Sequence, residues 1–183
     1  MIINVAPLLR DEVGAQANFS VAEDPIDPKG DNAELSEIGA TAVDADIVAT
    51  HTNPGAYLEG QAEARIEMEC GRCLRQFEGP VHAEFAEQYY ATIGVMNGEP
   101  MDSAPLDSKT IGSDFKIDVT PLIREELLLA MPLAPLHDPD CKGLCLVCGR
   151  DLNTEPHDHD SPVDERWAKL EVLKDFHAER ESD

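Results

Sequence analysis

The cysteines of this 183-residue chain are confined to two clusters, and this placement limits how the chain can fold. The first cluster is Cys70-Gly-Arg-Cys73, and the second is Cys141-Lys-Gly-Leu-Cys145-Leu-Val-Cys148. Two thiolates at Cys-x-x-Cys spacing can bind one metal ion, and zinc accepts sulfur and imidazole nitrogen together in a tetrahedron. Near the second cluster lie three histidines, which bring the candidate ligands to eight and so to two zinc sites: His137, His157 and His159.

Spacing alone leaves the pairing of these ligands open. One arrangement has two sites, each built from a Cys-x-x-Cys pair and two further ligands: Cys70, Cys73, His137 and Cys141 in one, and Cys145, Cys148, His157 and His159 in the other. The alternative is a zinc ribbon in which both Cys-x-x-Cys pairs bind one ion and the histidines do not. A single ion is compatible with either arrangement. For His157 and His159 alone, the competing interpretation is an acidic, solvated loop.

The cysteines and the N-terminal sequence together indicate in which cellular compartment the protein is found. Five cysteines are an odd number, which argues against a disulfide framework, and clustered thiols in a reducing compartment more often bind metal. Met1-Ile-Ile-Asn-Val-Ala-Pro lacks a basic stretch ahead of an apolar one, so we expect no secretory signal. No apolar run approaches the roughly 18 residues of a membrane helix. We therefore expect a cytoplasmic protein that does not enter a membrane.

The charge of the chain is strongly negative, with 14 Lys and Arg against 37 Asp and Glu and a net charge of −23. Nucleic-acid affinity comes mainly from cations that neutralise phosphates, so this composition argues against direct nucleic-acid binding. It favours a basic protein partner, such as a ribosomal protein. The competing interpretation is plain solubility or adaptation to a salty cytoplasm.

The hydrophobic pattern predicts a mostly β-structured domain. Residues 1–40 are expected to contain an N-terminal strand followed by a flexible acidic segment over 11–40, because this stretch is rich in Asp, Glu, Pro and Gly. Between Tyr57 and Glu69 apolar and polar residues alternate, which predicts a long antiparallel strand that leads to Cys70. A further strand is expected after Gly79-Pro80, so that Cys70 to Cys73 would be the turn of a hairpin.

Two helices are predicted on the C-terminal side of this hairpin. Thr120-Pro121 is typical of a helix start, and Pro132 would end that helix. The helical spacing of Val163, Trp167, Leu170, Leu173 and Phe176 predicts a C-terminal helix. The expected fold is α+β: a mainly antiparallel, barrel-like sheet with a middle helix over 41–135, then a Cys/His zinc module and the C-terminal helix over 136–183.

Neither of the two proposed zinc sites predicts catalysis. Each is filled by four protein ligands, whereas a catalytic zinc keeps a position open for water. No nucleophilic triad or phosphate-binding glycine loop is present, so we expect a protein that is not an enzyme. The alternative is a thiol-based redox or zinc sensor that uses Cys70 and Cys73. Against it, Gly79-Pro80 would end any helix after Cys70 within about one turn, and such helices activate redox cysteines.

The same residues resemble the YceD family. The family pattern contains a strand-borne Cys-x-Arg-Cys-Leu, matched at Cys70, Arg72, Cys73 and Leu74, and a later Cys-x-Gly-Leu-Cys-Pro-x-Cys-Gly, matched from Cys141 to Gly149. Leu146 stands in place of the proline, and His137 stands where similar proteins often have cysteine. The resemblance extends from about Thr41 to Leu173, and His157-x-His159 is most similar to the actinobacterial branch.

The resemblance implies a function in the accumulation of large ribosomal subunit RNA. Together with the metal ligands and the acidity, it leads us to expect a non-enzymatic zinc-binding factor in ribosome biogenesis. We further expect it to act as an acidic adaptor for a basic ribosomal protein, with one or two Zn²⁺ ions as its cofactor.

Overall fold

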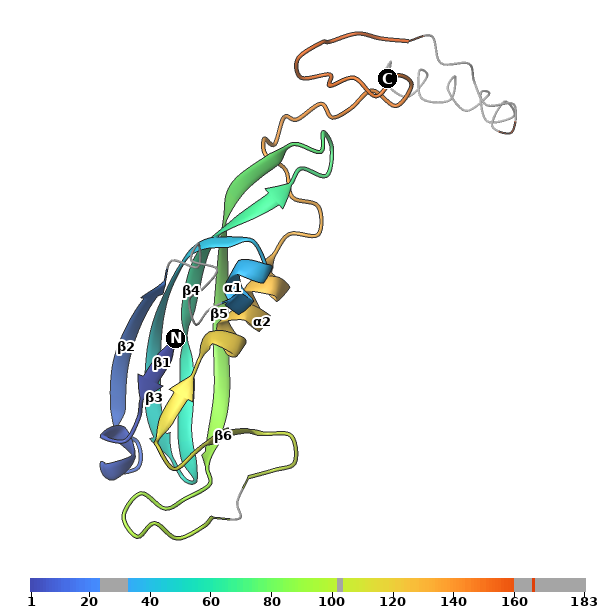
Figure 1. The fold of residues 1–183 in the computed structure, drawn as a ribbon. Helices are drawn as coiled ribbons and strands as arrows, with labels where there is room; N and C mark the ends of the chain where they lie inside the picture. Colours follow the sequence, from blue (N-terminus) through green and yellow to red (C-terminus); the bar gives the residue numbers. More distant parts are fainter. Residues whose placement is uncertain (24–32, 102–103, 160–165, 167–183) are drawn as a thin grey trace, which may run out of the picture. The chain divides into compact units, whose positions relative to one another are not determined.

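The computed structural model describes residues 1–23, 33–101, 104–159 and 166. The chain divides into two compact units, Met1–Cys141 and Lys142–Asp183, and each is considered by itself. Figure 1 shows the order of the elements in the first unit. Their bounds are β1 (Ile2–Asn4), η1 (Leu8–Arg10), β2 (Gln16–Glu23), α1 (Ala33–Glu37), β3 (Ala40–Thr52), β4 (Gly55–Glu69), β5 (Gln76–Ala91), β6 (Lys109–Ile111), β7 (Lys116–Asp118) and α2 (Thr120–Ala130).

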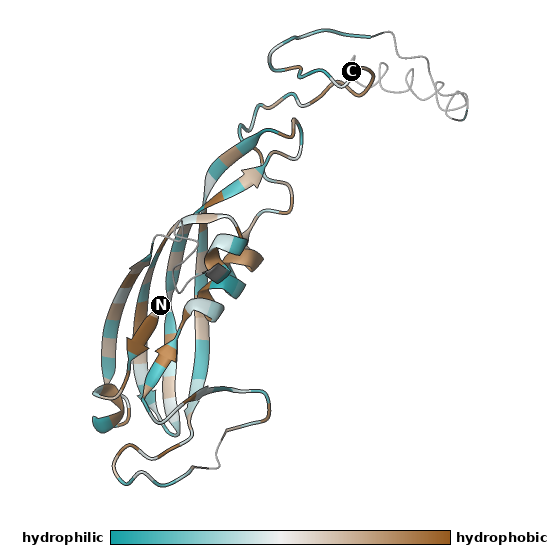
Figure 2. Cartoon of the chain, viewed as in Figure 1, coloured by the Kyte–Doolittle hydropathy of each residue, from teal (hydrophilic) through white to brown (hydrophobic). Residues whose placement is uncertain are grey.

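The first unit is built on a five-stranded sheet with strand order β2-β3-β4-β5-β6. All neighbours in it are antiparallel except β5 and β6, which are parallel. Apolar and polar residues alternate along β3, β4 and β5, so that one face of the sheet is buried and the other is exposed to solvent. We name the solvent-exposed face the wet face. Figure 2 shows this alternation as bands along the strands.

The buried face of the sheet packs against α1, α2 and the antiparallel pair of β1 and β7, which lie on the same side (Figure 1). Ile47, Leu58 and Ile66 of the sheet are at most 1% exposed, and so are Ile123 and Leu127 of α2. Each such side chain contributes about 1.5–3 kcal/mol relative to an exposed one. This aliphatic core fixes the β4–β5 hairpin against α2.

Helix α2 confirms the predicted middle helix. It begins at Thr120, one residue before Pro121, and the Asp118 carboxylate accepts the backbone N–H of Thr120 at 3.0 Å. It ends at Ala130, because Met131 is extended, as a residue before proline prefers to be. The chain is therefore no longer helical after Ala130 and leads on to His137 and Cys141.

Two expectations from the sequence are wrong. The sheet does not close into a barrel: among the described residues, β2 and β6 are its edges and do not pair with each other. Residues 16–23 are not flexible, because they form β2 and pair with β3 from Gln16↔Thr50 to Glu23↔Val43. Pairing with β3 supplies hydrogen bonds and packing that order this stretch, and its polar composition gave no sign of that pairing. The predicted C-terminal helix over 163–176 lies outside the described residues, apart from Arg166.

The hairpin of β4 and β5 is long and regular. The two strands pair from Gly55↔Tyr90 to Glu69↔Gln76, and the predicted alternation over 57–69 is confirmed. The turn between them holds Cys70 and Cys73, as expected. Of the helices within the described residues, none is both long and apolar enough to cross a membrane.

Candidate metal centres

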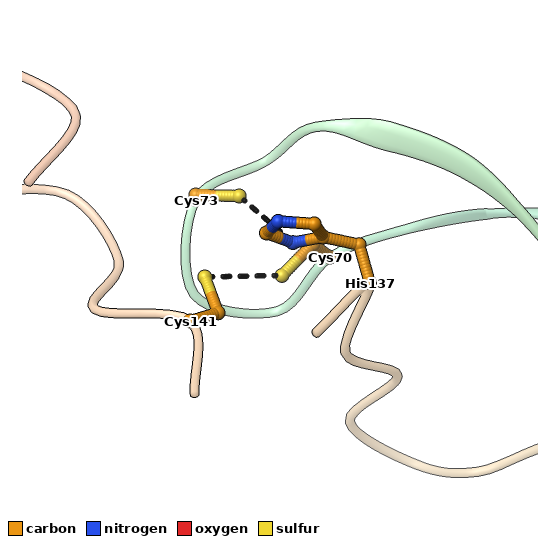
Figure 3. Close-up of side chains that lie close together, drawn as sticks. All are labelled: Cys70, Cys73, His137 and Cys141. Atoms are coloured by element: carbon orange, nitrogen blue, oxygen red, sulfur yellow. Dashed lines mark hydrogen bonds between the residues drawn. The ribbon is translucent and has the colours of Figure 1, made fainter. Parts of the chain in front are cut away.

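The first cluster of ligands combines the hairpin turn with the chain that leaves α2. Cys70, Cys73, His137 and Cys141 each offer one ligand atom, and these atoms all lie within 4.8 Å of one another. Figure 3 shows the four side chains converging on one point, two from the turn and two from the later segment. We name this group site 1.

The distances in site 1 fit a tetrahedral zinc ion. The sulfur atoms of Cys70 and Cys141 are 3.8 Å apart, and Cys73 Sγ lies 3.5 Å from His137 Nδ1 (Figure 3). Bond lengths of about 2.3 Å to sulfur and about 2.0–2.1 Å to nitrogen place tetrahedral ligands at separations of about 3.8 Å and about 3.5 Å. The side chains are therefore already spaced for the ion.

The turn that carries Cys70 and Cys73 is shaped by two backbone hydrogen bonds. The N–H of Cys70 donates to the carbonyl of Arg75, and the N–H of Leu74 donates to the carbonyl of Cys70, both at 2.9 Å. Closing this turn places Leu74 in the left-handed region, at φ 59°. A third bond, from the N–H of Gly71 to the carbonyl of Pro135 at 2.8 Å, holds the chain after α2 against the turn.

Arg72 links the two parts of site 1. Its guanidinium donates to the carbonyl of Cys141 at 2.8 Å and to the carbonyl of Pro139 at 3.2 Å. Three thiolates on a divalent ion leave about one negative charge, which a neighbouring guanidinium offsets. Arg72 therefore lies where its positive charge can offset that of the thiolates. Lys142 is exposed, and its contact is through the backbone, whose N–H donates to Asn153 Oδ1 at 2.8 Å.

The second cluster lies within the second unit. Cys145, Cys148, His157 and His159 also offer ligand atoms within 4.8 Å of one another. Cys148 Sγ lies 3.1 Å from His157 Nε2 and 3.3 Å from His159 Nε2. The Nδ1 of His157 is 2.7 Å from the carbonyl of Glu155, which orients the ring so that Nε2 faces the sulfur. We name this group site 2.

The turn of site 2 repeats the backbone of the turn in site 1. The N–H of Cys145 donates to the carbonyl of Arg150 at 2.7 Å, and the N–H of Gly149 donates to the carbonyl of Cys145 at 2.8 Å. Gly149 occupies the left-handed position, at φ 72°. The sites differ in burial: the cysteines of site 1 are all buried, whereas in site 2 Cys148 is exposed.

The surroundings shift the pKa values of several candidate ligands. A hydrogen bond with the His137 side chain lowers the pKa of Cys70 to about 5, whereas burial raises the pKa of Cys73. The backbone N–H groups of Cys148 and Val147 lower the pKa of Cys145 to about 6. The hydrogen bond with the Glu155 carbonyl raises the pKa of His157. His137 in site 1 and the backbone of the turn in site 2 thus favour the thiolates of Cys70 and Cys145, which are the form that binds metal.

The structure therefore brings the eight candidate ligands together in two groups of four, which is the first of the two arrangements that the sequence left open.

Sequence reasoning missed the residues that support site 2. Asn153 accepts the N–H of Lys142, and its own N–H donates to the Asp151 carboxylate at 2.8 Å. The only signal for this turn was the polar run Asp151-Leu-Asn-Thr154, which many loops share.

Comparisons with known proteins agree with these motifs. A family model described as "Large ribosomal RNA subunit accumulation protein YceD" matches residues 58–174. An uncharacterized protein of Mycobacterium tuberculosis (strain ATCC 25618 / H37Rv) is 29% identical over 155 residues, which cover 84% of this chain and 73% of that protein. No solved structure matches the chain.

Two relatives carry the family description in their names. The "Large ribosomal RNA subunit accumulation protein YCED homolog 1, chloroplastic" of Zea mays is 45% identical over 42 residues, covering 23% of this chain and 14% of that protein. The "Large ribosomal RNA subunit accumulation protein YceD" of Haemophilus influenzae is 25% identical over 83 residues, covering 45% of this chain and 46% of that protein.

Proposed function

The chain belongs to the YceD family of large ribosomal RNA subunit accumulation proteins, and we propose that it is a non-enzymatic zinc-binding factor that assists accumulation of this RNA. The observation that carries the zinc proposal is the convergence of two four-ligand groups, with separations in site 1 that match a tetrahedral ion. Bound zinc would supply structural stability, because it would join the β4–β5 turn to the segment after α2.

The ligand sets support a structural role for the metal. Each site offers four sulfur or imidazole ligands, so a tetrahedral ion in it has no position left for water or substrate. A catalytic zinc activates a bound water, and sites 1 and 2 would have none. We therefore propose that the protein acts by binding rather than by catalysis.

The charge of the chain supports a basic partner. With a net charge of −23, the protein repels phosphate and attracts Lys- and Arg-rich surfaces. We propose that it acts as an adaptor for a basic ribosomal protein, and that it reaches the large-subunit RNA only through that partner.

The test is complementation of a strain that lacks the gene. The ratio of large-subunit to small-subunit RNA is measured with the wild-type chain, with Cys70→Ser and with Lys116→Ala, whose side chain is exposed and lies outside both sites. Wild type and Lys116→Ala are expected to restore the ratio, and Cys70→Ser to restore it less. Full restoration by Cys70→Ser would contradict the need for site 1.

The adaptor role is tested separately by capture from lysate. A basic ribosomal protein is expected to co-purify at low salt and to be released at high salt, because the attraction is electrostatic. Recovery of RNA that survives high salt, with no basic protein, would contradict the adaptor role.

A thiol-based sensor is the second candidate, and the low pKa of Cys70 favours it. Burial counts against it, because Cys70 is fully buried and Cys73 is only 8% exposed, so oxidants have little access. The sensor predicts that mild peroxide releases zinc and links Cys70 to Cys73 reversibly. Protected thiols under the same treatment would exclude it.

A further inference from the structure

The wet face of the five-stranded sheet carries a cluster of carboxylates at its centre. Strand pairing places Ser20, Asp46, Gln61 and Glu84 side by side across β2, β3, β4 and β5. The next row on one side contains Val48, Glu59 and Ala86, and the next on the other contains Asp44, Glu63 and His82. We name the five acidic residues of these rows the acidic face: Asp44, Asp46, Glu59, Glu63 and Glu84.

Four of the five carboxylates of the acidic face form no ion pair within the described residues. These three rows contain no Lys or Arg, and all five carboxylates are exposed. Glu63 lies 3.3 Å from His82 Nδ1, whereas Asp44, Asp46, Glu59 and Glu84 form no ion pair with a described cation. Like charges on adjacent strands repel one another and are stabilised when a cation binds between them.

A hollow in the sheet surface coincides with this face. It has a volume of about 840 Å³, is open to solvent, and is lined by residues that include Asp46, Glu59 and Glu84. Ile47 and Phe85 also border it, but they are 1% and 5% exposed because their side chains point into the core. The hollow therefore lies on the wet side, where the carboxylates are.

The negative charge of the acidic face and the spacing of its carboxylates indicate which kind of ligand it can bind. We propose that the acidic face binds an extended segment rich in Lys and Arg, supplied by the basic partner; this inference rests on the proposed adaptor role. In an extended chain alternate side chains are about 7 Å apart, which is also the spacing of Asp44 and Asp46 along β3, so two successive cations can meet these two carboxylates. On β4, Gln61 separates Glu59 from Glu63, so cations four residues apart in the segment can meet those two carboxylates. Their aliphatic stems can lie on Val48 and Ala86 while the charged ends reach the carboxylates. A phosphate backbone has the wrong sign for this face.

The experiment measures the affinity of the zinc-loaded full chain for a labelled peptide of about 12 residues in which Lys alternates with Ser. The test variant combines Asp46→Asn, Glu59→Gln and Glu84→Gln. The control combines Asp11→Asn, Glu12→Gln and Asp107→Asn, exposed sites outside the acidic face. Both variants lose three negative charges. The test variant is expected to bind about 10-fold more weakly, and the control to stay within about 2-fold of wild type.

Three outcomes would overturn the inference: equal weakening in both variants, no binding of the peptide by the wild-type chain, or binding of a single-stranded RNA oligonucleotide that the peptide cannot displace. A second variant, Glu59→Lys with Glu84→Lys, should abolish peptide binding if the face is the site. Metal content and complementation of RNA accumulation are measured on the same variants. Peptide binding at the face together with failed complementation by the wild-type chain would refute the proposed function and not the inference.

Discussion

At the scale of single residues, Leu74 and Gly149 hold the same position in the two Cys-x-x-Cys turns. Both are in the left-handed region, at φ 59° and φ 72°, but only one is glycine. This conformation costs a non-glycine residue about 1–2 kcal/mol. Leu74 is 57% exposed, and a Cβ at Gly149 would meet nothing within 4 Å. The effect of a substitution at either position should therefore depend on backbone conformation and not on side-chain packing.

We therefore expect that placing glycine at position 74 stabilises the protein and that replacing glycine at position 149 weakens metal binding. Leu74→Gly should raise the free energy of unfolding by up to about 1 kcal/mol, and Gly149→Ala should lower the metal affinity of site 2 by about 5- to 10-fold. Chemical denaturation measures the first change and competitive zinc titration the second. A destabilised Leu74→Gly would show that the Leu74 side chain contributes more by packing than its backbone costs.

The thiols of the metal-free protein should titrate at widely different pH values. The pKa of Cys70 is lowered to about 5 and that of Cys145 to about 6, whereas that of Cys73 is raised. Thiolate absorbance should therefore rise first near pH 5 and then near pH 6. Cys70→Ser should remove the first rise and Cys145→Ser the second. Titration of every thiol near pH 9 would contradict the hydrogen bonds described for Cys70 with His137 and for Cys145 with the backbone of its turn.

The eight candidate ligands could be found from sequence because metal-binding chemistry depends on residue type and short spacing. Their pairing could not, because His137 and Cys141 reach Cys70 only through the path of α2 and the contact of Gly71 with Pro135. For the same reason, Asn153 had no visible role until the turn of site 2 was closed.

At the scale of elements, the β4–β5 hairpin depends on a glycine within a strand. A Cβ at Gly60 would lie 2.2 Å from the carbonyl oxygen of Asp46 and 2.9 Å from Phe85 Cζ. Gly60→Ala should therefore destabilise the protein by about 1–3 kcal/mol, because backbone and ring must shift. Gly112→Ala is the matched control, since the nearest atom to its Cβ is 3.5 Å away. Thermal unfolding of both variants checks this, and equal melting temperatures would refute it.

The long strands were predictable because their alternation extends over many residues, as in β4 and β5. Strand β2 was missed because its apolar residues, Ala17, Phe19 and Val21, are only half-buried at a sheet edge and are followed by an acidic stretch rich in proline. Closure into a barrel depends on how the edges β2 and β6 are placed. Alternation within a strand carries no information about that.

At the scale of the whole molecule, net charge is the dominant feature. A charge of −23 destabilises the compact state through self-repulsion, and salt screens that repulsion. The melting temperature should therefore rise when potassium chloride is increased from about 0.01 M to about 1 M. The Asp46→Asn, Glu59→Gln, Glu84→Gln variant should show a smaller rise, because it carries less charge. A melting temperature independent of salt would contradict this.

We propose that the protein is folded around two zinc ions with separate ligand sets. The most direct measurement is elemental analysis of untagged protein, repeated on Cys70→Ser and His157→Ala. Sites 1 and 2 predict two zinc ions per wild-type chain, with one ion lost in each variant. A single ion that is lost in Cys70→Ser and kept in His157→Ala would contradict the two-site arrangement, and wild-type protein without metal would contradict the zinc proposal altogether.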